Sequence, residues 1–144
     1  MILPILTDGD KALLKKSKRV AKIDDTIRNI AANLVETMSH NQGVGLAAPQ
    51  CGIHKQIIVV LVNDEPKVMV NPEIIFTSPE TEVCEEGCLS IPGTFIEKER
   101  NKTVTVKYRN LKGHPHLETH EGLVARVIQH EIDHLQGVLM TAAS

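Results

Sequence analysis

The segment 121–136 restricts the fold most, because its spacing suits a helix but one face of that helix is not simply apolar. At about 100° per residue, five side chains fall on one side of this predicted helix. They are Leu123, Arg126, Val127, His130 and His134. A buried helix face normally carries apolar residues. The two histidines and the arginine therefore indicate a pocket whose floor holds a metal.

The same helix carries the pattern His-Glu-x-x-His at His130, Glu131 and His134. Two imidazoles one helical turn apart can bind one metal ion, with the glutamate beside them as a candidate general base. The pattern also arises by chance on helices with two surface histidines. A catalytic metal site usually has three protein ligands. No His or Glu follows His134, so the third ligand must lie upstream.

We expect this third ligand to be the thiolate of Cys88. Gly87 precedes it and allows the backbone an unusual turn and a close approach. Cys84, four residues earlier, is the rival ligand, and the Cys-x-x-x-Cys spacing could itself indicate a metal-binding pair. We prefer one thiolate with two histidines. The alternative for a free cysteine is a small buried apolar residue, which is what we expect for Cys84 and Cys51. Three cysteines do not suggest a disulfide framework and fit a reducing compartment.

The rest of the chain predicts an α+β fold, with residues 1–144 as a single domain. Apolar spacing predicts a helix over 25–39, which Asp24 or Asp25 can cap. Strands are predicted at 57–62, 68–70, 74–76 and 103–108, followed by a turn at 110–113 that leads into 116–118. Asn71-Pro72 separates the second strand from the third. We expect antiparallel strands packed around the helix that carries His-Glu-x-x-His, plus the N-terminal helix.

Composition excludes several classes of protein. The net charge is −2 and the charged content 24%, which argues against the basic surface that nucleic-acid binding needs. No apolar run reaches the ~18–20 residues of a membrane span. The N-terminus lacks the features of a signal peptide.

Three motifs together carry more information than any one of them. They are Gly-Val-Gly-Leu-Ala-Ala-Pro-Gln at 43–50, Glu-Gly-Cys-Leu-Ser at 86–90 and Gln-His-Glu-Ile-Asp-His-Leu at 129–135. In this order and at these separations they resemble the signature motifs of peptide deformylase, the enzyme that removes the formyl group from N-formylmethionyl chains. The resemblance spans nearly the whole sequence.

The resemblance implies a role for specific residues. Cys88, His130 and His134 would hold one divalent ion, natively Fe²⁺, with Zn²⁺, Ni²⁺ or Co²⁺ able to replace it. Glu131 would be the general base. The Gln50 side-chain amide and the Leu89 backbone N–H would stabilise negative charge on the formyl oxygen.

The substrate implied is an N-formylmethionyl peptide or nascent chain. The backbones near Gly45 and Gly87 would pair with it as an added strand. The helix face and the family position together suggest that Leu123, Val127 and Cys84 line the methionine pocket.

Two residues near this site each have two interpretations. Arg126 departs from the family pattern, where an apolar residue is usual. It is either a surface arginine with a packed stem, or a polar edge of the methionine pocket or a contact with the substrate chain. Asp133 either orients a ligand imidazole or serves as a cap or salt-bridge partner.

The location implied is a bacterial-type cytoplasm, or an organelle, although no transit segment is visible. Many family members carry a C-terminal helix implicated in ribosome docking. The sequence closes at Ser144, which leaves ribosome docking open. Two rival functions share parts of the pattern. One is a zincin-like peptidase, which does not account for the Cys88 segment or Gln50, and the other is a metal-holding or peptide-binding module without catalysis.

Overall fold

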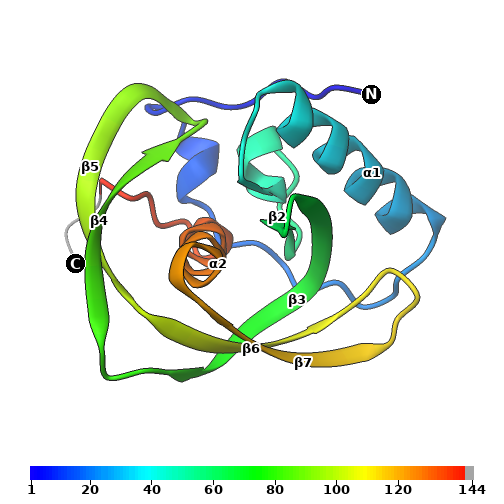
Figure 1. The fold of residues 1–144 in the computed structure, drawn as a ribbon. Coiled ribbons are helices and arrows are strands. Elements are labelled where there is room, and N and C mark those ends of the chain that lie inside the picture. Colours follow the sequence, from blue (N-terminus) through cyan, green and yellow to red (C-terminus); the bar gives the residue numbers. More distant parts are fainter. Residues whose placement is uncertain (142–144) are drawn as a thin grey trace.

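The computed structural model describes residues 1–141 and belongs to the α+β class, as expected (Figure 1). Its helices are α1 (Asp25–His40), α2 (Gly122–Leu135) and two short 3₁₀ helices, η1 (Lys11–Leu14) and η2 (Ala48–Cys51). Its strands are β1 (Gly45–Ala47), β2 (Ile57–Val62), β3 (Glu65–Thr77), β4 (Thr81–Cys88), β5 (Ile91–Asn101), β6 (Thr103–Arg109) and β7 (Pro115–Glu121).

Helix α1 begins where the sequence predicts. The carboxylate of Asp24 accepts a hydrogen bond from the Ile27 backbone N–H and so caps the first turn. This satisfies one of the N–H groups that a helix leaves unpaired at its start. The buried side of α1 packs in a core cluster with residues of β1, β2 and β3.

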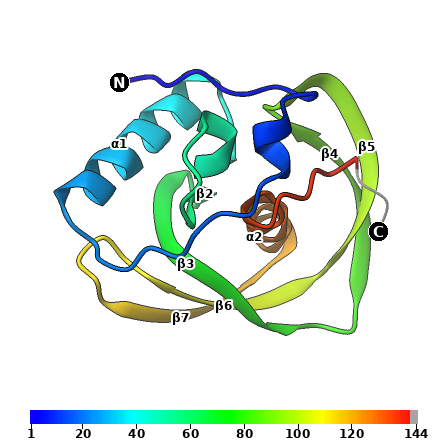
Figure 2. The same ribbon diagram turned by 180° about the vertical axis from the view of Figure 1, so that it is seen from behind.

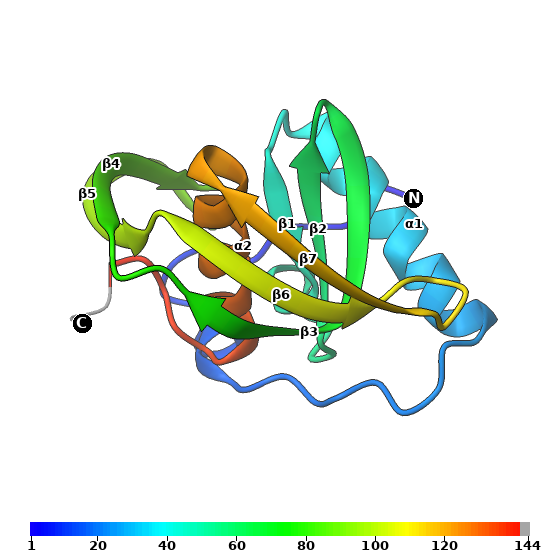
Figure 3. The same cartoon turned by 60° about the horizontal axis from the view of Figure 1, so that its bottom comes forward.

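Five strands form an antiparallel sheet in the order β1-β2-β3-β6-β7 (Figure 3). The β-branched run of β2 lies near the middle and is largely buried. β1 is an edge strand, so one side of its backbone does not pair within this sheet.

The predicted break at Asn71-Pro72 is wrong, because β3 runs through it. The register with β6 shifts between Val70 and Glu73, which marks a bulge. Asn71 takes a positive φ of 52° there, and its side-chain amide bonds both the N–H and the C=O of Val20. A bulge absorbs the extra residue without ending the strand.

Strands β4 and β5 form a separate two-stranded ribbon, which the sequence did not predict. In Figures 1 and 2, α2 is seen nearly end-on between this ribbon and the large sheet. The apolar side of α2, including Ala125, Ile128 and Leu135, packs against the large sheet in one core cluster. The helix can therefore present its remaining face toward the ribbon.

In residues 1–141, no helix is long and apolar enough to cross a membrane.

Candidate metal centre and active site

Three possible metal ligands from two elements meet at one point. Cys88 ends β4, while His130 and His134 lie one turn apart on α2. Their donor atoms all lie within 4.8 Å of one another, and Cys88 Sγ is 3.3 Å from His134 Nε2. Among residues 1–141 this is the only group of three His, Cys, Asp or Glu side chains with such spacing.

The donor set fits a divalent transition-metal ion. Bonds of about 2.3 Å to sulfur and 2.05 Å to nitrogen at a tetrahedral angle place those two atoms about 3.5 Å apart, close to the Cys88–His134 distance. One sulfur and two imidazoles suit several such metals. Three protein ligands also leave a fourth position open, as in catalytic sites.

The pKa values of the two imidazoles are shifted in opposite directions. Burial, reinforced by the positive charge of His130, lowers the pKa of His134 to about 3. Burial also acts to lower the pKa of His130, but hydrogen bonds with Cys88 and Glu86 outweigh it and raise the pKa to about 10. A metal ion competes with that proton, because imidazole binds metals in its neutral form.

Glu86 orients His130 from behind. Its Oε1 lies 3.0 Å from His130 Nδ1, which directs the other ring nitrogen toward the donor cluster. Burial acts to raise the pKa of Glu86, but the hydrogen bonds from His130 and Arg100 outweigh it and hold that pKa well below its ordinary range. Arg100 donates to both carboxylate oxygens, at 2.9 and 3.0 Å. The Glu86 carboxylate is therefore a fixed anion.

Glu131 is a buried carboxyl group beside the donor cluster. It is only 4% exposed, and burial raises its pKa to about 7. Its Oε1 has no hydrogen-bond partner among the described residues. A buried carboxylate oxygen without a hydrogen bond destabilises the folded protein, so we expect this atom to bond a water molecule or a group of the substrate. A pKa near neutrality suits a group that must both take and release a proton.

The side chain of Gln50 is locked in one orientation. Its Oε1 accepts a hydrogen bond from the Ala47 N–H at 2.9 Å, so its amide nitrogen must face the other way. That nitrogen lies 3.1 Å from Ser90 Oγ and 3.6 Å from Cys88 Sγ. The amide N–H groups of Gln50 therefore point toward the donor cluster.

A cleft of about 560 Å³ opens over the cluster. This volume is typical of small-molecule and peptide sites. Its walls come from the chain before and in β1, from the end of the ribbon and from the first half of α2. The lining includes Gly43, Val44, Gly45, Gln50, Glu86, Gly87, Cys88, Leu89, Phe95, Leu123, Arg126, Val127, His130 and Glu131.

Comparison with known proteins identifies the family. The family model described as polypeptide deformylase matches residues 2–143. The chain belongs to the peptide deformylase family. A peptide deformylase of Thermotoga sp. (strain RQ2) is 51% identical over 132 residues, which cover 92% of this chain and 80% of the relative.

Solved structures of peptide deformylases have the same fold. The enzyme of Thermotoga maritima matches with a TM-score of 0.94 at 48% identity, over 96% of this chain and 95% of that one. The Acinetobacter baumannii enzyme bound to Met-Ala-Ser matches with a TM-score of 0.93 at 35% identity, over 97% and 96% of the two chains. The family resemblance inferred from the three motifs is thus confirmed. This chain is a hydrolase of the deformylase type.

The structure brings most of the expected deformylase residues together. Gly45, Gln50, Gly87, Cys88, Leu89, Leu123, Arg126, Val127, His130 and Glu131 all line the cleft. His134 lies beneath it and is 1% exposed. Leu123 stands at the rim with 67% of its surface exposed.

Cys84 differs from expectation. Its thiol is exposed rather than packed as a small apolar residue. It lines a neighbouring cavity of about 150 Å³ rather than the main cleft. Glu85, Leu123 and Arg126 line both cavities, so the two cavities are adjacent.

Arg126 is not a surface arginine, which settles one of its two interpretations. It is 7% exposed, and its guanidinium bonds Glu86 Oε2 at 2.6 Å. The Asp133 carboxylate pairs with Arg100 at 2.6 Å, so the salt-bridge interpretation of Asp133 is correct. The carboxylate that bonds a candidate ligand imidazole is Glu86, beside His130. Its place directly before Gly87-Cys88 was the available signal, whereas nothing local distinguishes Arg100.

Proposed function

We propose that this chain carries out the family's reaction on N-formylmethionyl peptides with a defined division of roles. Cys88, His130 and His134 hold one divalent ion, and Glu131 moves the protons. Gln50 and the Leu89 backbone N–H stabilise the negative charge that develops on the formyl oxygen. Water adds to the formyl carbon, the C–N bond breaks, and the products are formate and a peptide with a free methionine amine.

The observation that carries this proposal is the buried Glu131 carboxyl beside three convergent metal donors. When bound, the ion would polarise the formyl oxygen and make a water molecule more acidic. Glu131 takes the proton of the attacking water and later delivers one to the departing amine. Its pKa of about 7 allows both transfers near neutral pH.

The fixed amide of Gln50 supports the second role. Because Ala47 holds its oxygen, the amide nitrogen is preorganised and needs no reorientation during the reaction. Such a donor is worth about 3–4 kcal/mol of barrier. A metal-only binding module would have no use for this arrangement.

We propose that the peptide backbone of the substrate pairs along β1 near Gly45 and along the ribbon near Gly87. The free side of the edge strand β1 supports this mode, because strand addition needs unpaired backbone groups. The methionine side chain would contact Leu123, Arg126 and Val127. Cys84 lines the neighbouring cavity and would not contact this side chain within the main cleft.

The bound tripeptide in the Acinetobacter relative supports this choice of substrate. Met-Ala-Ser is what remains when formyl-Met-Ala-Ser loses its formyl group. We further propose Fe²⁺ as the native ion, a bacterial-type cytoplasm or organelle as the location, and residues 1–144 as one catalytic domain built around α2. No contact with nucleic acid or a membrane is proposed, and ribosome docking is left open.

The test compares formyl-Met-Ala-Ser, acetyl-Met-Ala-Ser and Met-Ala-Ser under anaerobic conditions, with metal analysis of the same preparation. Anaerobic handling protects an Fe²⁺–thiolate centre. Formate should be released from the first peptide alone. Cleavage of internal peptide bonds would instead support the zincin-like rival, and metal binding without any turnover would support the non-catalytic one.

Glu131→Gln is the matched variant for this test. It keeps the volume of the side chain but cannot accept the proton. We expect it to retain the metal and to lose turnover. A variant that keeps full formate release would remove Glu131 from its proposed role.

A further inference from the structure

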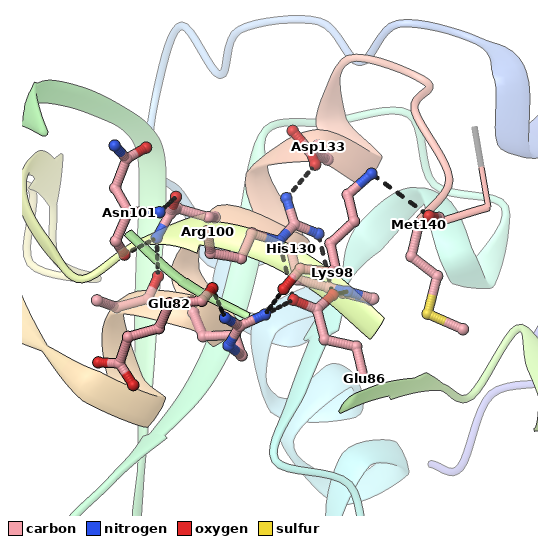
Figure 4. A network of polar contacts seen from close by, with 11 residues as sticks. Glu82, Glu86, Lys98, Arg100, Asn101, His130, Asp133 and Met140 are labelled. Atoms are coloured by element: carbon pink, nitrogen blue, oxygen red, sulfur yellow. Dashed lines mark hydrogen bonds and ion pairs between the residues drawn. The ribbon is translucent and has the colours of Figure 1, made fainter. Parts of the chain in front are cut away.

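The face of α2 that meets the ribbon is polar, and its residues follow helical spacing. Arg126, Gln129, His130 and Asp133 stand at positions i, i+3, i+4 and i+7, which places them along one stripe. Each of them bonds to a residue of β4 or β5. Figure 4 shows part of this network, in which Arg100 reaches Asp133 and Glu86 lies beside His130.

Apolar packing contributes little to this contact. Two large apolar side chains of the ribbon, Val83 and Phe95, are 59% and 65% exposed. The apolar anchor of the ribbon lies near its turn, where Ile91 and Ile96 pack with Leu139 and Met140 of the C-terminal segment. The position of the ribbon against α2 therefore depends on hydrogen bonds and ion pairs.

Arg126 makes the most extensive of these contacts. Its Nη1 donates to Glu86 Oε2 at 2.6 Å and to the Lys98 carbonyl at 2.8 Å, and its Nη2 donates to the Glu82 carbonyl at 2.6 Å. One helical side chain thus holds both strands of the ribbon. Three of its five N–H groups are used in this way.

We propose that Arg126 is a positioning residue: it clamps the β4–β5 ribbon to α2 and thereby fixes Cys88 at its distance from His130 and His134. The inference rests on the proposed function in so far as these three side chains are metal ligands. Cys88 ends β4 two residues after Glu86, whereas both histidines belong to α2. Any displacement of the ribbon along α2 changes the separation of the thiol from the imidazoles.

Charge alone predicts the opposite effect on the metal. Loss of the Arg126 cation leaves the surroundings of the site more negative, which would hold a divalent cation more tightly. Loss of a clamp disturbs the ligand geometry, and such changes behind a metal ligand typically cost roughly 10- to 100-fold in affinity. The direction of the change therefore separates the two effects.

The experiment uses Arg126→Met, Arg126→Lys and the control Arg109→Met. Arg109 is exposed and its guanidinium bonds the Gly113 carbonyl at the β6–β7 turn, far from the cleft lining. Zinc release to a chelator is measured on the loaded proteins. Amide hydrogen exchange is measured on the metal-free proteins, with β2 and β3 as an internal reference.

For Arg126→Met we expect zinc release to accelerate roughly 10- to 100-fold, with faster exchange confined to β4 and β5. Arg126→Lys keeps a charge beside Glu86 but cannot bridge both carbonyls, so it should fall between wild type and Arg126→Met. Arg109→Met should match wild type in both measurements. If Arg126→Met is poorly folded, Arg126→Lys provides the same comparison.

Four results would overturn the proposal. For Arg126→Met, these are zinc release that is slower or unchanged, amide exchange that increases equally in both sheets, and a rise in KM alone with exchange unaltered. For Arg126→Lys, it is behaviour identical to that of wild type. If wild type releases no formate but the zinc and exchange results hold, the proposed function fails and the clamp stands.

Discussion

Replacing Gly45 by alanine should displace the side chain of Glu131, the proposed general base. Gly45 does not have a positive φ, so alanine meets no backbone strain there. The added Cβ would lie 2.6 Å from Glu131 Oε2 and 2.6 Å from Val127 Cγ1. Ordinary contacts between carbon atoms are about 3.5–4.0 Å, so at least one of these groups must move by about 1 Å.

The free space open to the Glu131 carboxylate is the cleft that it lines, so the added Cβ would displace this carboxylate from its proposed catalytic position. Glu131 is almost fully buried and stands on α2 between the proposed ligands His130 and His134, the first of which bonds Glu86. A displacement of about 1 Å in a catalytic group can cost roughly 100-fold in rate. Overpacking of this kind costs about 1–3 kcal/mol of stability. We therefore expect kcat to fall about 100-fold while the metal content stays near that of wild type.

Gly113→Ala is the matched control for loss of stability. Gly113 has a φ of +82°, and its added Cβ would meet nothing within 4 Å. Alanine there pays about 1–2 kcal/mol of backbone strain at a turn remote from the cleft. Formate release and thermal unfolding should be measured on both variants. If Gly45→Ala keeps kcat within threefold of wild type at a comparable loss of stability, the placement of Glu131 against β1 is wrong.

Three further predictions follow from the site and the thiols. Gln50→Ala should lower kcat by roughly 10²–10³-fold with metal content unchanged, which turnover and metal analysis on one preparation will check. Burial raises the pKa of Glu131 to about 7, so its contribution to the stability of the metal-free protein is present below the unfolded value near 4.5 and is lost as the pH rises through 7. The free energy of unfolding of metal-free Glu131→Gln should therefore be higher than that of metal-free wild type by up to about 3 kcal/mol at pH 8, and the two should be equal at pH 4. Denaturant titrations that show no pH-dependent difference would contradict this. Burial also raises the pKa of Cys51 to about 11, so a thiol reagent at pH 8 should modify the exposed Cys84 well before Cys51, and Cys84→Ser should remove the fast phase.

The elements that could be predicted from the sequence are those whose pattern is local. Helix α1, strand β2 and strand β6 carry their own periodicity and end where it ends. The strand break predicted at Asn71 is wrong, because a residue far away in the sequence stabilises the continuous strand there. The backbone of Val20, 51 residues away, pairs with the Asn71 amide and stabilises the bulge. Local propensity cannot show a contact of that range.

The candidate site also has one part that the sequence predicts and another part that depends on distant contacts. The proposed metal ligands, base and amide donor lie in three short motifs, whose order and separation in the sequence make them recognisable together. The ribbon between two of these motifs has mostly exposed, charged strands, so no apolar alternation marks it as a sheet. The role of Glu86 depends on Arg100, which is 14 residues away along the ribbon, and on Arg126, which is 40 residues away on α2. Neither partner is close to Glu86 in the sequence, so local pattern does not reveal the role of this carboxylate.

The two arginines are not interchangeable, although both bind Glu86. Arg100 belongs to the ribbon and reaches across to Asp133 on α2, whereas Arg126 belongs to α2 and reaches back to the backbone of both strands. Two carboxylates and two guanidiniums balance, so this network adds no net charge beside a divalent cation. Because one guanidinium comes from each element, neither element can shift without breaking bonds made by the other. Removing one partner of such a buried pair leaves the other charge buried and unpaired, at a cost of about 3–5 kcal/mol. A displacement of the ribbon that separates these groups is opposed for the same reason.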